Sequence, residues 1–324
     1  MPCEDDRVPL AWLPYADRAE AEHRLGRIPH GIDLGFYRAD GDPMPDRIGE
    51  VAFYVLPYMK GPGVLDRAAE MTSLRVVQTL TAGYEELLPL LPDTATLCNA
   101  AGVHDDSTAE LAIALTLASG RHLDDFARDQ ASGRWAPVVG RALADQRVLI
   151  IGYGRIGTAI ERRLQGFEVA SITRVARRPR TGPPAVRPIE DLPRLLPDAD
   201  VAILIAPHTP ETEGMIGPAE LALLPDGALL VNVARGKLVD TDALTAAVST
   251  GRIRAALDVV DPEPLPADHP LWRLPGVLIS PHVGGASSAF APRADRLIAA
   301  QLARFASGEP LVNVVRPAPA GRAR

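Results

Sequence analysis

Cysteine is scarce in this chain of 324 residues, since only Cys3 and Cys98 occur and neither has the spacing of a metal-binding motif. A disulfide scaffold and a structural zinc module are therefore excluded, and we expect no bound metal. No apolar run approaches the ~20 residues that a membrane-spanning helix needs. Residues 1–6 are acidic where a signal peptide would be basic, so we expect a cytoplasmic protein with no membrane partner.

Basic residues are fewer than acidic residues. Lys and Arg total 34 against 41 Asp and Glu, which gives a net charge of −7. Because the basic residues are scattered rather than gathered on one segment, we expect no nucleic-acid partner. The 47% of apolar residues is typical of a globular protein, and 324 residues exceed what one hydrophobic core usually supports, which predicts two domains.

The clearest motif is a glycine-rich turn between an apolar strand and a helix. Residues 147–151 run into Gly152-Tyr153-Gly154-Arg155-Ile156-Gly157, and residues 158–164 continue at helical spacing. The first glycine permits the turn, the second lets a pyrophosphate approach the backbone, and the third lets the helix pack on the strand. The motif with both flanking elements predicts a dinucleotide at the helix N-terminus, against the alternative of a plain glycine turn.

Apolar segments alternate with helical segments along the chain, which predicts an α/β fold with mainly parallel sheets. In the N-terminal part we expect strands at 8–13, 51–56, 75–80 and 95–98, and helices at 16–25, 64–71 and 84–91. After the glycine motif we expect strands at 169–175, 201–206, 228–233, 255–260 and 277–279. With 147–151 these make six strands, the number in a dinucleotide-binding sheet.

Two long helices and one isolated strand complete this interpretation. A capping box at Ser107 and Glu110 opens a helix that we expect to reach about Gln130 as a spine between two domains. A last helix is expected at 288–307. The strand expected at 311–315 has no partner in the second sheet, so it should return to the first.

Three polar residues follow three successive predicted strands: Arg235, Glu263 and His282. Each alone could be an ordinary turn residue, either solvated or satisfied by the backbone. Because the carboxyl ends of parallel strands share one edge of the sheet, where such folds bind their ligands, we expect the three side chains close to a nicotinamide ring.

These residue types suit the reduction of a 2-oxo acid. Arginine can hold the substrate carboxylate and polarise its carbonyl without titrating. Histidine can protonate the carbonyl oxygen as hydride arrives, because its pKa lies near working pH. A glutamate bonded to the second imidazole nitrogen would fix the tautomer and raise the pKa of the histidine.

The chain resembles the D-isomer-specific 2-hydroxyacid dehydrogenase family, including its glyoxylate/hydroxypyruvate reductase-like and phosphoglycerate dehydrogenase-like members. Besides the glycine motif, the matches are 103–110, 209–212, 214–216, 231–236, 258–264 and 281–285, within a likeness that runs from about 51 to 315. The resemblance implies an NAD(P)-dependent D-2-hydroxyacid dehydrogenase with Arg235, Glu263 and His282 as catalytic triad. It also implies a Rossmann dinucleotide-binding domain, residues 102–285, inserted into a flavodoxin-like α/β substrate domain, residues 1–101 and 286–324.

Further site residues follow from this likeness. Asp258 would bond to the nicotinamide carboxamide, and the backbone N–H groups of Ala82 and Gly83 would receive the substrate carboxylate across the cleft. From the residue types beside Ala82 and Gly83, independently of the likeness, we expect Tyr58, Met59 and Tyr84 to line the mouth of the substrate pocket. Members are commonly homodimers, and the loop with Trp135 would then reach the partner's site. The remaining cofactor contacts are expected at Pro207, Thr212, Val233, Ala234, His282 and Gly284.

The strand at 169–175 leads into Arg177 and Arg178, and no acid lies between positions 172 and 182 to accept the ribose 2′-hydroxyl of NAD. Two guanidinium groups can instead pair with a 2′-phosphate. We therefore favour NADP(H). The alternative is NAD(H), with solvated loop arginines. Glu168 would lie at the start of the strand, which is the wrong end for an acid that accepts the ribose 2′-hydroxyl of NAD.

We expect a small 2-oxo acid such as glyoxylate or hydroxypyruvate as substrate, with a D-2-hydroxy acid as product. Lys60 could bind a second anionic group or simply be solvated. Two other interpretations remain: the same scaffold acting on formate, phosphite or another donor that is not a hydroxy acid, or a nicotinamide-sensing corepressor-like binding protein. The chain shows no extended interaction tail or basic patch, which disfavours the second.

Overall fold

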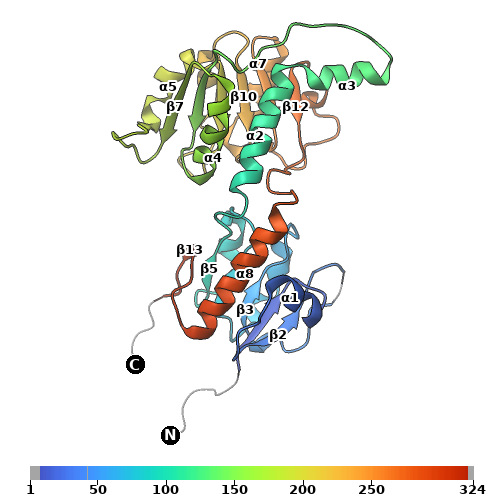
Figure 1. Cartoon of the computed structure of the whole chain (residues 1–324), viewed down its shortest axis with the longest axis vertical. Helices are drawn as coiled ribbons and strands as arrows, with labels where there is room; N and C mark the ends of the chain where they lie inside the picture. Colours follow the sequence, from blue (N-terminus) through green and yellow to red (C-terminus); the bar gives the residue numbers. More distant parts are fainter. Residues whose placement is uncertain (1–7, 42, 320–324) are drawn as a thin grey trace. The chain divides into compact units, whose positions relative to one another are not determined.

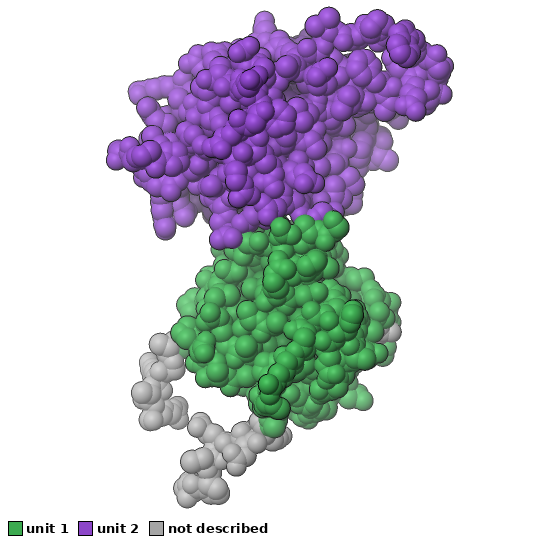
Figure 2. All heavy atoms as spheres, in the orientation of Figure 1, with its two compact units in different colours: residues 1–104, 288–324 green, residues 105–287 purple. Residues whose placement is uncertain are grey.

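The computed structural model describes residues 8–41 and 43–319, and the chain forms two compact units (Figure 2). Unit 1 comprises Met1–His104 and Ser288–Arg324, and unit 2 comprises Asp105–Ser287. Unit 2 is thus an insertion in the sequence of unit 1. Each unit has its own β-sheet with hydrophobic clusters on both faces.

Unit 1 is built on a six-stranded sheet in the order β13-β5-β4-β3-β1-β2. All its neighbours pair in parallel except β13, which runs antiparallel to β5 and confirms the predicted return of the C-terminal strand. Helices α1 and α8 cover one face (Figure 1), and short 3-10 segments cover the other. The bounds are β1 (Leu10–Leu13), α1 (Arg18–Leu25), β2 (Asp33–Phe36), η1 (Ile48–Glu50), β3 (Val51–Val55), η2 (Pro62–Leu65), η3 (Ala68–Glu70), β4 (Val76–Gln78), η4 (Glu85–Leu90), β5 (Thr96–Cys98), α8 (Phe290–Ser307) and β13 (Val314–Arg316).

Three elements of unit 1 differ from the sequence-based prediction. Strand β2 was missed because it contains only two large apolar residues. Its Gly35 is required by packing, since a Cβ there would lie 2.5 Å from the Trp12 ring on β1. The helices predicted at 64–71 and 84–91 are wrong, because both segments form 3-10 turns. In the second, Pro89 lies inside the segment and cannot donate the hydrogen bond of an α-helix.

Unit 2 is built on a seven-stranded parallel sheet in the order β12-β11-β10-β9-β6-β7-β8. The six predicted strands are confirmed, and a two-residue strand, β8, adds a seventh. Helices α2 and α4 pack on one face, and α5, α6 and α7 pack on the other. Across the described residues of both units, no helix is long and apolar enough to span a bilayer. The bounds are α2 (Asp105–Gly120), α3 (Leu123–Ala131), β6 (Arg147–Ile151), α4 (Arg155–Leu164), η5 (Gln165–Phe167), β7 (Ser171–Ala176), β8 (Arg187–Pro188), η6 (Ile189–Asp191), α5 (Leu192–Leu195), η7 (Leu196–Asp198), β9 (Val201–Leu204), α6 (Pro218–Leu223), β10 (Leu229–Asn232), η8 (Gly236–Leu238), α7 (Thr241–Ser249), β11 (Arg254–Leu257), η9 (Pro270–Trp272) and β12 (Val277–Ile279).

The continuous spine predicted from Ser107 to about Gln130 is wrong, because α2 ends at Gly120 and α3 starts at Leu123. The chain returns to this point at Arg141, whose N–H donates to the carbonyl of Gly120 at 2.8 Å. A Cβ at Gly120 would lie 2.9 Å from the Arg141 carbonyl oxygen, so the close approach requires glycine. The returning segment therefore bonds to the Gly120 carbonyl, which would accept an N–H of the next turn if the helix continued.

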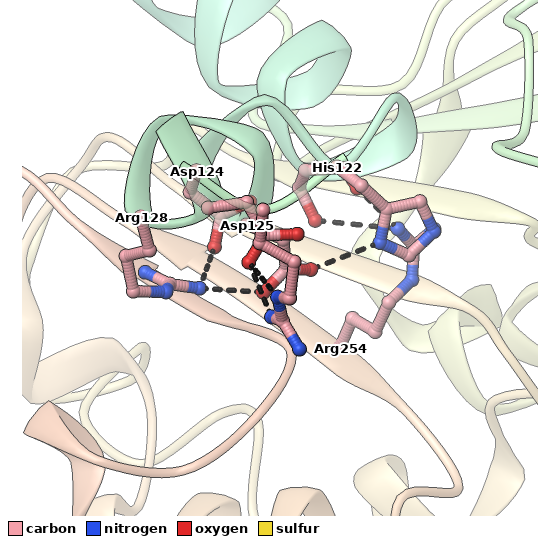
Figure 3. A network of polar contacts seen from close by, with 8 residues as sticks. His122, Asp124, Asp125, Arg128 and Arg254 are labelled. Atoms are coloured by element: carbon pink, nitrogen blue, oxygen red, sulfur yellow. Dashed lines mark hydrogen bonds and ion pairs between the residues drawn. The ribbon is translucent and has the colours of Figure 1, made fainter. Parts of the chain in front are cut away.

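Polar contacts hold the break between the two helices (Figure 3). His122 adopts a left-handed conformation with φ of 57°, and its ring nitrogen Nδ1 lies 3.2 Å from a carboxylate oxygen of Asp125. Arg254, on β11, donates to the backbone carbonyl of Ser119 at 2.6 Å. Arg128 bonds to Asp124 at 2.8 Å and to Asp125 at 2.7 Å on the exposed side of α3. The sequence pattern of apolar spacing carries no signal for such contacts.

A fully buried glutamine attaches the end of unit 1 to its sheet. Gln301 on α8 donates from Nε2 to the side-chain oxygen of Gln78 at 2.7 Å and to the carbonyl of Val312 at 2.9 Å. Its own side-chain oxygen accepts from the Val312 N–H at 3.0 Å. The carboxamide thus pairs with Val312 on both sides, as a neighbouring strand would, just before β13 begins.

We predict that Gln301→Leu lowers the free energy of unfolding of unit 1 by about 2–5 kcal/mol, because each buried polar group left without a partner costs ~1–3 kcal/mol. The measurement is urea unfolding followed by fluorescence of the buried Trp12. Arg296→Ala, an exposed position on the same helix, is the control and should change stability little. Equal stability of Gln301→Leu and the unchanged protein would contradict this account of the attachment.

Candidate active site

The glycine motif joins β6 to α4 as predicted, and each glycine has a different surrounding. Gly152 has φ of 104°, and a Cβ there would lie 2.5 Å from the backbone N of Ala206. A Cβ at Gly157 would collide with the carbonyl oxygen of Gly152. A Cβ at Gly154 would meet no protein atom within 4 Å, and no side chain caps the N-terminus of α4. Two glycines therefore serve packing, while the open space at the third and the free helix N-terminus fit a bound pyrophosphate.

The other predicted cofactor positions follow the carboxyl ends of neighbouring parallel strands. Thr212 donates from its hydroxyl to the carbonyl of Pro207 at 2.8 Å, which closes the turn after β9. Val233 and Ala234 follow β10, and Ala234 donates its N–H to the Asn232 side chain at 3.1 Å. Gly284 follows β12. The sheet order brings these segments to the same edge as the glycine motif.

Tyr153 of the motif anchors the start of the loop that follows β7. Its hydroxyl donates to Glu161 on α4, which also forms an ion pair with Arg174 on β7. The guanidinium of Arg180 lies 5.4 Å from the Tyr153 ring centroid, within range of a cation–π contact. The sequence analysis did not assign Arg180 to the site, although it belongs to the same acid-free run as Arg177.

Arg177, Arg178 and Arg180 are all exposed directly after β7. A hydrogen bond from Thr209, with the positive charge of Arg177 as a smaller contribution, holds the pKa of Glu211 below its ordinary value. The charge of Arg177 therefore acts on Glu211 in the turn at 209–212. Glu168 precedes β7, so it lies at the opposite end of that strand from the arginines, as expected.

Arg235, Glu263 and His282 follow β10, β11 and β12, which are adjacent parallel strands. The structure brings Glu263 and His282 into contact: the imidazole Nδ1 lies 2.5 Å from a carboxylate oxygen of Glu263. Carboxylate oxygens only accept hydrogen bonds, so Nδ1 carries the proton in this pair and Nε2 is the nitrogen directed away from it. Arg235 also acts on this pair, because its positive charge opposes protonation of His282.

The turn that carries Arg235 is fixed by a buried asparagine. Asn232 accepts from the Ala234 N–H at 3.1 Å and donates to the Arg235 carbonyl at 3.0 Å. At Gly236, a Cβ would collide with the carbonyl of Val260. This close approach packs the Arg235 turn against the chain that leads from β11 towards Glu263.

A buried carboxylate holds the turn around His282. His282 has φ of 52°, a conformation that is unfavourable for a residue with a side chain. Asp258 accepts from the hydroxyl of Ser280 at 2.6 Å, and from the N–H groups of Val283 at 2.9 Å and Gly284 at 2.8 Å. This turn-holding role has no signal in the sequence pattern, and the nicotinamide contact expected for Asp258 stays a prediction.

The residues expected to contact substrate in unit 1 lie in the loops after β3 and β4. Met59 has φ of 58° and is 57% exposed. Ala82 and Gly83 are partly exposed in the loop after β4. Lys60 lies 2.6 Å from a carboxylate oxygen of Asp40, so it is already paired. Among the residues described, no three His, Cys, Asp or Glu side chains gather closely enough to hold a metal ion.

The hydrogen bond to Glu263 raises the pKa of His282 above its ordinary value, and the charge of Glu263 adds to this effect. Burial and the charge of Arg235 act in the opposite direction but do not cancel it. The imidazolium form therefore persists to a higher pH in the folded protein than in an unfolded chain. The stability it contributes is fully present below the pKa of an unfolded histidine and is lost as the pH rises through the raised folded value.

We predict that Glu263→Gln lowers the pKa of His282, because a neutral amide cannot stabilise the imidazolium charge. The measurement is a pH titration of the His282 ring signals by NMR. Glu190→Gln, outside the site on η6, is the control and should leave the titration unchanged. The account is wrong if His282 titrates at the same pH in the Glu263→Gln variant and the unchanged protein.

Comparisons with known proteins agree with this arrangement. A family model described as D-isomer specific 2-hydroxyacid dehydrogenase, NAD binding domain, matches residues 113–284. Glyoxylate reductase/hydroxypyruvate reductase from Homo sapiens is 33% identical over 267 residues, which cover 76% of this chain and 78% of that protein. Glyoxylate reductase from Pyrococcus horikoshii is 35% identical over 252 residues, which cover 73% of this chain and 74% of that one.

A similar solved structure is the NADPH-dependent glyoxylate/hydroxypyruvate reductase from Sinorhizobium meliloti in complex with NADP and malonate. It is 28% identical, has a TM-score of 0.78, and the match covers 96% of this chain and 98% of that chain. Sequence, fold and the meeting of Glu263 with His282 at the ends of adjacent strands lead to one conclusion. The chain belongs to the D-isomer-specific 2-hydroxyacid dehydrogenase family and is an NAD(P)-dependent oxidoreductase of 2-hydroxy acids.

Proposed function

We propose that this enzyme reduces glyoxylate, hydroxypyruvate or a closely related small 2-oxo acid to the D-2-hydroxy acid, with NADPH as the preferred cofactor. The observation that carries the proposal is the 2.5 Å contact between His282 and Glu263 beside the Arg235 turn. The human relative is named for the reduction of glyoxylate and hydroxypyruvate, and the Pyrococcus relative is named for the reduction of glyoxylate, which supports this substrate class.

Each residue of the proposed triad has a distinct task. Arg235 binds the substrate carboxylate and polarises the carbonyl that is reduced. Glu263 accepts a hydrogen bond from the Nδ1–H of His282, so Nε2 is the nitrogen that delivers a proton to the carbonyl oxygen. The raised pKa of His282 keeps that proton available to a higher pH than an ordinary histidine would. The reduced nicotinamide, when bound, supplies the hydride.

The preference for NADP(H) rests on charge. The adenosine ribose of a cofactor bound at the glycine motif would lie near the segment after β7. That segment contains Arg177, Arg178 and Arg180. A 2′-phosphate offers them an anionic partner that NAD lacks. The Sinorhizobium relative is described as NADPH-dependent, which supports the same preference. NAD(H) is the alternative cofactor.

The proposal also assigns the units and their assembly. Unit 2 is the dinucleotide-binding domain, and unit 1 is the substrate domain that supplies the Ala82 and Gly83 N–H groups and Met59. We infer a homodimer in the cytoplasm. The loop after α3 exposes Trp135 by 95% and Val139 by 97%, and such apolar exposure favours contact with a second copy. In this dimer Trp135 reaches the partner subunit.

We predict that the enzyme oxidises NADPH in the presence of glyoxylate or hydroxypyruvate, and that His282→Ala lowers kcat by about 10²–10⁴-fold, the usual contribution of a general acid. The measurement is the loss of NADPH absorbance against a panel of 2-oxo acids. His23→Ala, an exposed position on α1, is the control. If NADPH binds but no acid is reduced, the protein is a cofactor-sensing binding protein instead.

We predict that replacing Arg177 and Arg178 together by serine raises the KM for NADPH by about 10- to 100-fold and changes the KM for NADH by less than threefold. A hydrogen bond to a charged group contributes about 1.5–3 kcal/mol, which corresponds to this range. Arg194→Ser on α5 is the matched control. A tenfold preference of the unchanged enzyme for NADH would refute the role given to these arginines.

A further inference from the structure

In the loop after β4, the four successive carbonyl groups of residues 80–83 all accept hydrogen bonds. These donors come from inside unit 1 and hold the loop along its whole length. They are His104 Nε2 to Leu80 at 2.7 Å, Ala100 N–H to Thr81 at 2.9 Å, Asn99 Nδ2 to Ala82 at 2.7 Å, and the Thr81 hydroxyl to Gly83 at 2.7 Å.

The N–H groups on either side of Ala82 and Gly83 are both occupied. Thr81 donates its N–H to the hydroxyl oxygen of Thr79 at 3.2 Å, and Tyr84 donates to the carboxylate of Glu85 at 3.0 Å. Between them, no hydrogen-bond acceptor in residues 8–41 and 43–319 meets the N–H of Ala82 or of Gly83. Two successive backbone N–H groups without an acceptor offer donors to an anion.

The orientation of these two N–H groups follows from the carbonyls that share their peptide units. In a trans peptide the C=O and the N–H point in opposite directions. The Ala82 N–H belongs to the peptide of the Thr81 carbonyl, and the Gly83 N–H belongs to the peptide of the Ala82 carbonyl. Because Asn99 holds the Ala82 carbonyl, it also sets the direction of the Gly83 N–H.

Asn99 is itself fixed on every side. It is 8% exposed, and its side-chain oxygen accepts from the Ala101 N–H at 3.2 Å. Its backbone N–H donates to the carbonyl of Asn313 at 3.0 Å, and its backbone carbonyl accepts from Gln78 at 3.1 Å. The Ala82 carbonyl can only accept and the Ala101 N–H can only donate, so the carboxamide has one orientation.

We propose that Asn99 is a positioning residue for substrate: it holds the Ala82–Gly83 peptide so that the Gly83 N–H, next to the N–H of Ala82, faces the carboxylate of the 2-oxo acid. This inference rests on the proposed function for the choice of ligand. Asn99 does not touch the substrate and acts only through the peptide that it binds. Glu85 occupies the next N–H along, which limits the anion site to the Ala82 and Gly83 groups.

The selective variant is Asn99→Asp, which keeps an acceptor for the Ala101 N–H but loses the donor to the Ala82 carbonyl. We expect the KM for glyoxylate at saturating NADPH to rise about 10- to 100-fold, equivalent to one hydrogen bond to a charged group. The kcat should stay within about threefold, and the Kd for NADPH should not change. Asn99→Ala, which adds no charge, should give the same direction of change.

Asn313→Asp is the matched control, because the same substitution removes a donor to the carbonyl of Ala101, outside the loop. Its KM for glyoxylate should stay within about threefold of the unchanged enzyme. A loss of general structural integrity would lower kcat and weaken NADPH binding in both variants. A rise in KM alone, limited to the Asn99 variants, separates positioning from such a loss.

A second readout does not depend on turnover. In enzyme labelled with ¹⁵N at alanine and glycine, titration with oxamate in the presence of NADP⁺ should shift the Ala82 and Gly83 amide signals. The Gly83 shift should be lost in Asn99→Asp. If oxamate does not move these signals in the unchanged enzyme, the inference is overturned.

The two readouts also separate this inference from the proposed function. If the enzyme reduces glyoxylate and Asn99→Asp keeps the original KM, the positioning role falls and the reaction stands. If no 2-oxo acid is reduced but oxamate shifts the Gly83 amide signal only while Asn99 is present, the reaction is refuted and the positioning role is retained.

Discussion

The contact between Glu263 and His282 is the interaction on which the account of this enzyme depends. It joins residues from two loops that follow adjacent parallel strands, so it forms only when β11 and β12 are in register. It also decides the chemistry, because it fixes which imidazole nitrogen holds its proton towards the glutamate and raises the pKa of the ring. The topology of the sheet therefore determines that Nε2 is the imidazole nitrogen directed away from Glu263.

Within each unit, buried polar side chains use their hydrogen bonds to hold turns. Asp258 holds the turn of His282, Asn232 holds the turn of Arg235, and Asn99 holds the loop after β4. Each is less than 10% exposed and bonds to backbone groups close by in sequence or space. Such bonds fix loop conformations that hydrophobic packing alone leaves free, which is why the candidate site residues sit on ordered turns.

The sequence predicted those features that have a periodic or local signal. The buried strands of unit 2 read as apolar runs, and their order along the chain placed Arg235, Glu263 and His282 at one edge of the sheet. It failed where tertiary contacts decide: the end of α2 depends on the chain returning at Arg141. For the same reason Arg180 was overlooked, since its place above Tyr153 depends on the fold. The short β2 and β8 lack any apolar run.

The most direct test combines two pH titrations on the same preparations of the unchanged enzyme and of Glu263→Gln. One follows kcat/KM for glyoxylate reduction with NADPH, and the other follows the His282 ring by NMR. The account predicts that activity declines with rising pH at the pKa of His282, and that both move to lower pH together when Glu263 is replaced. A decline that stays in place while the pKa of His282 moves would show that another group supplies the proton.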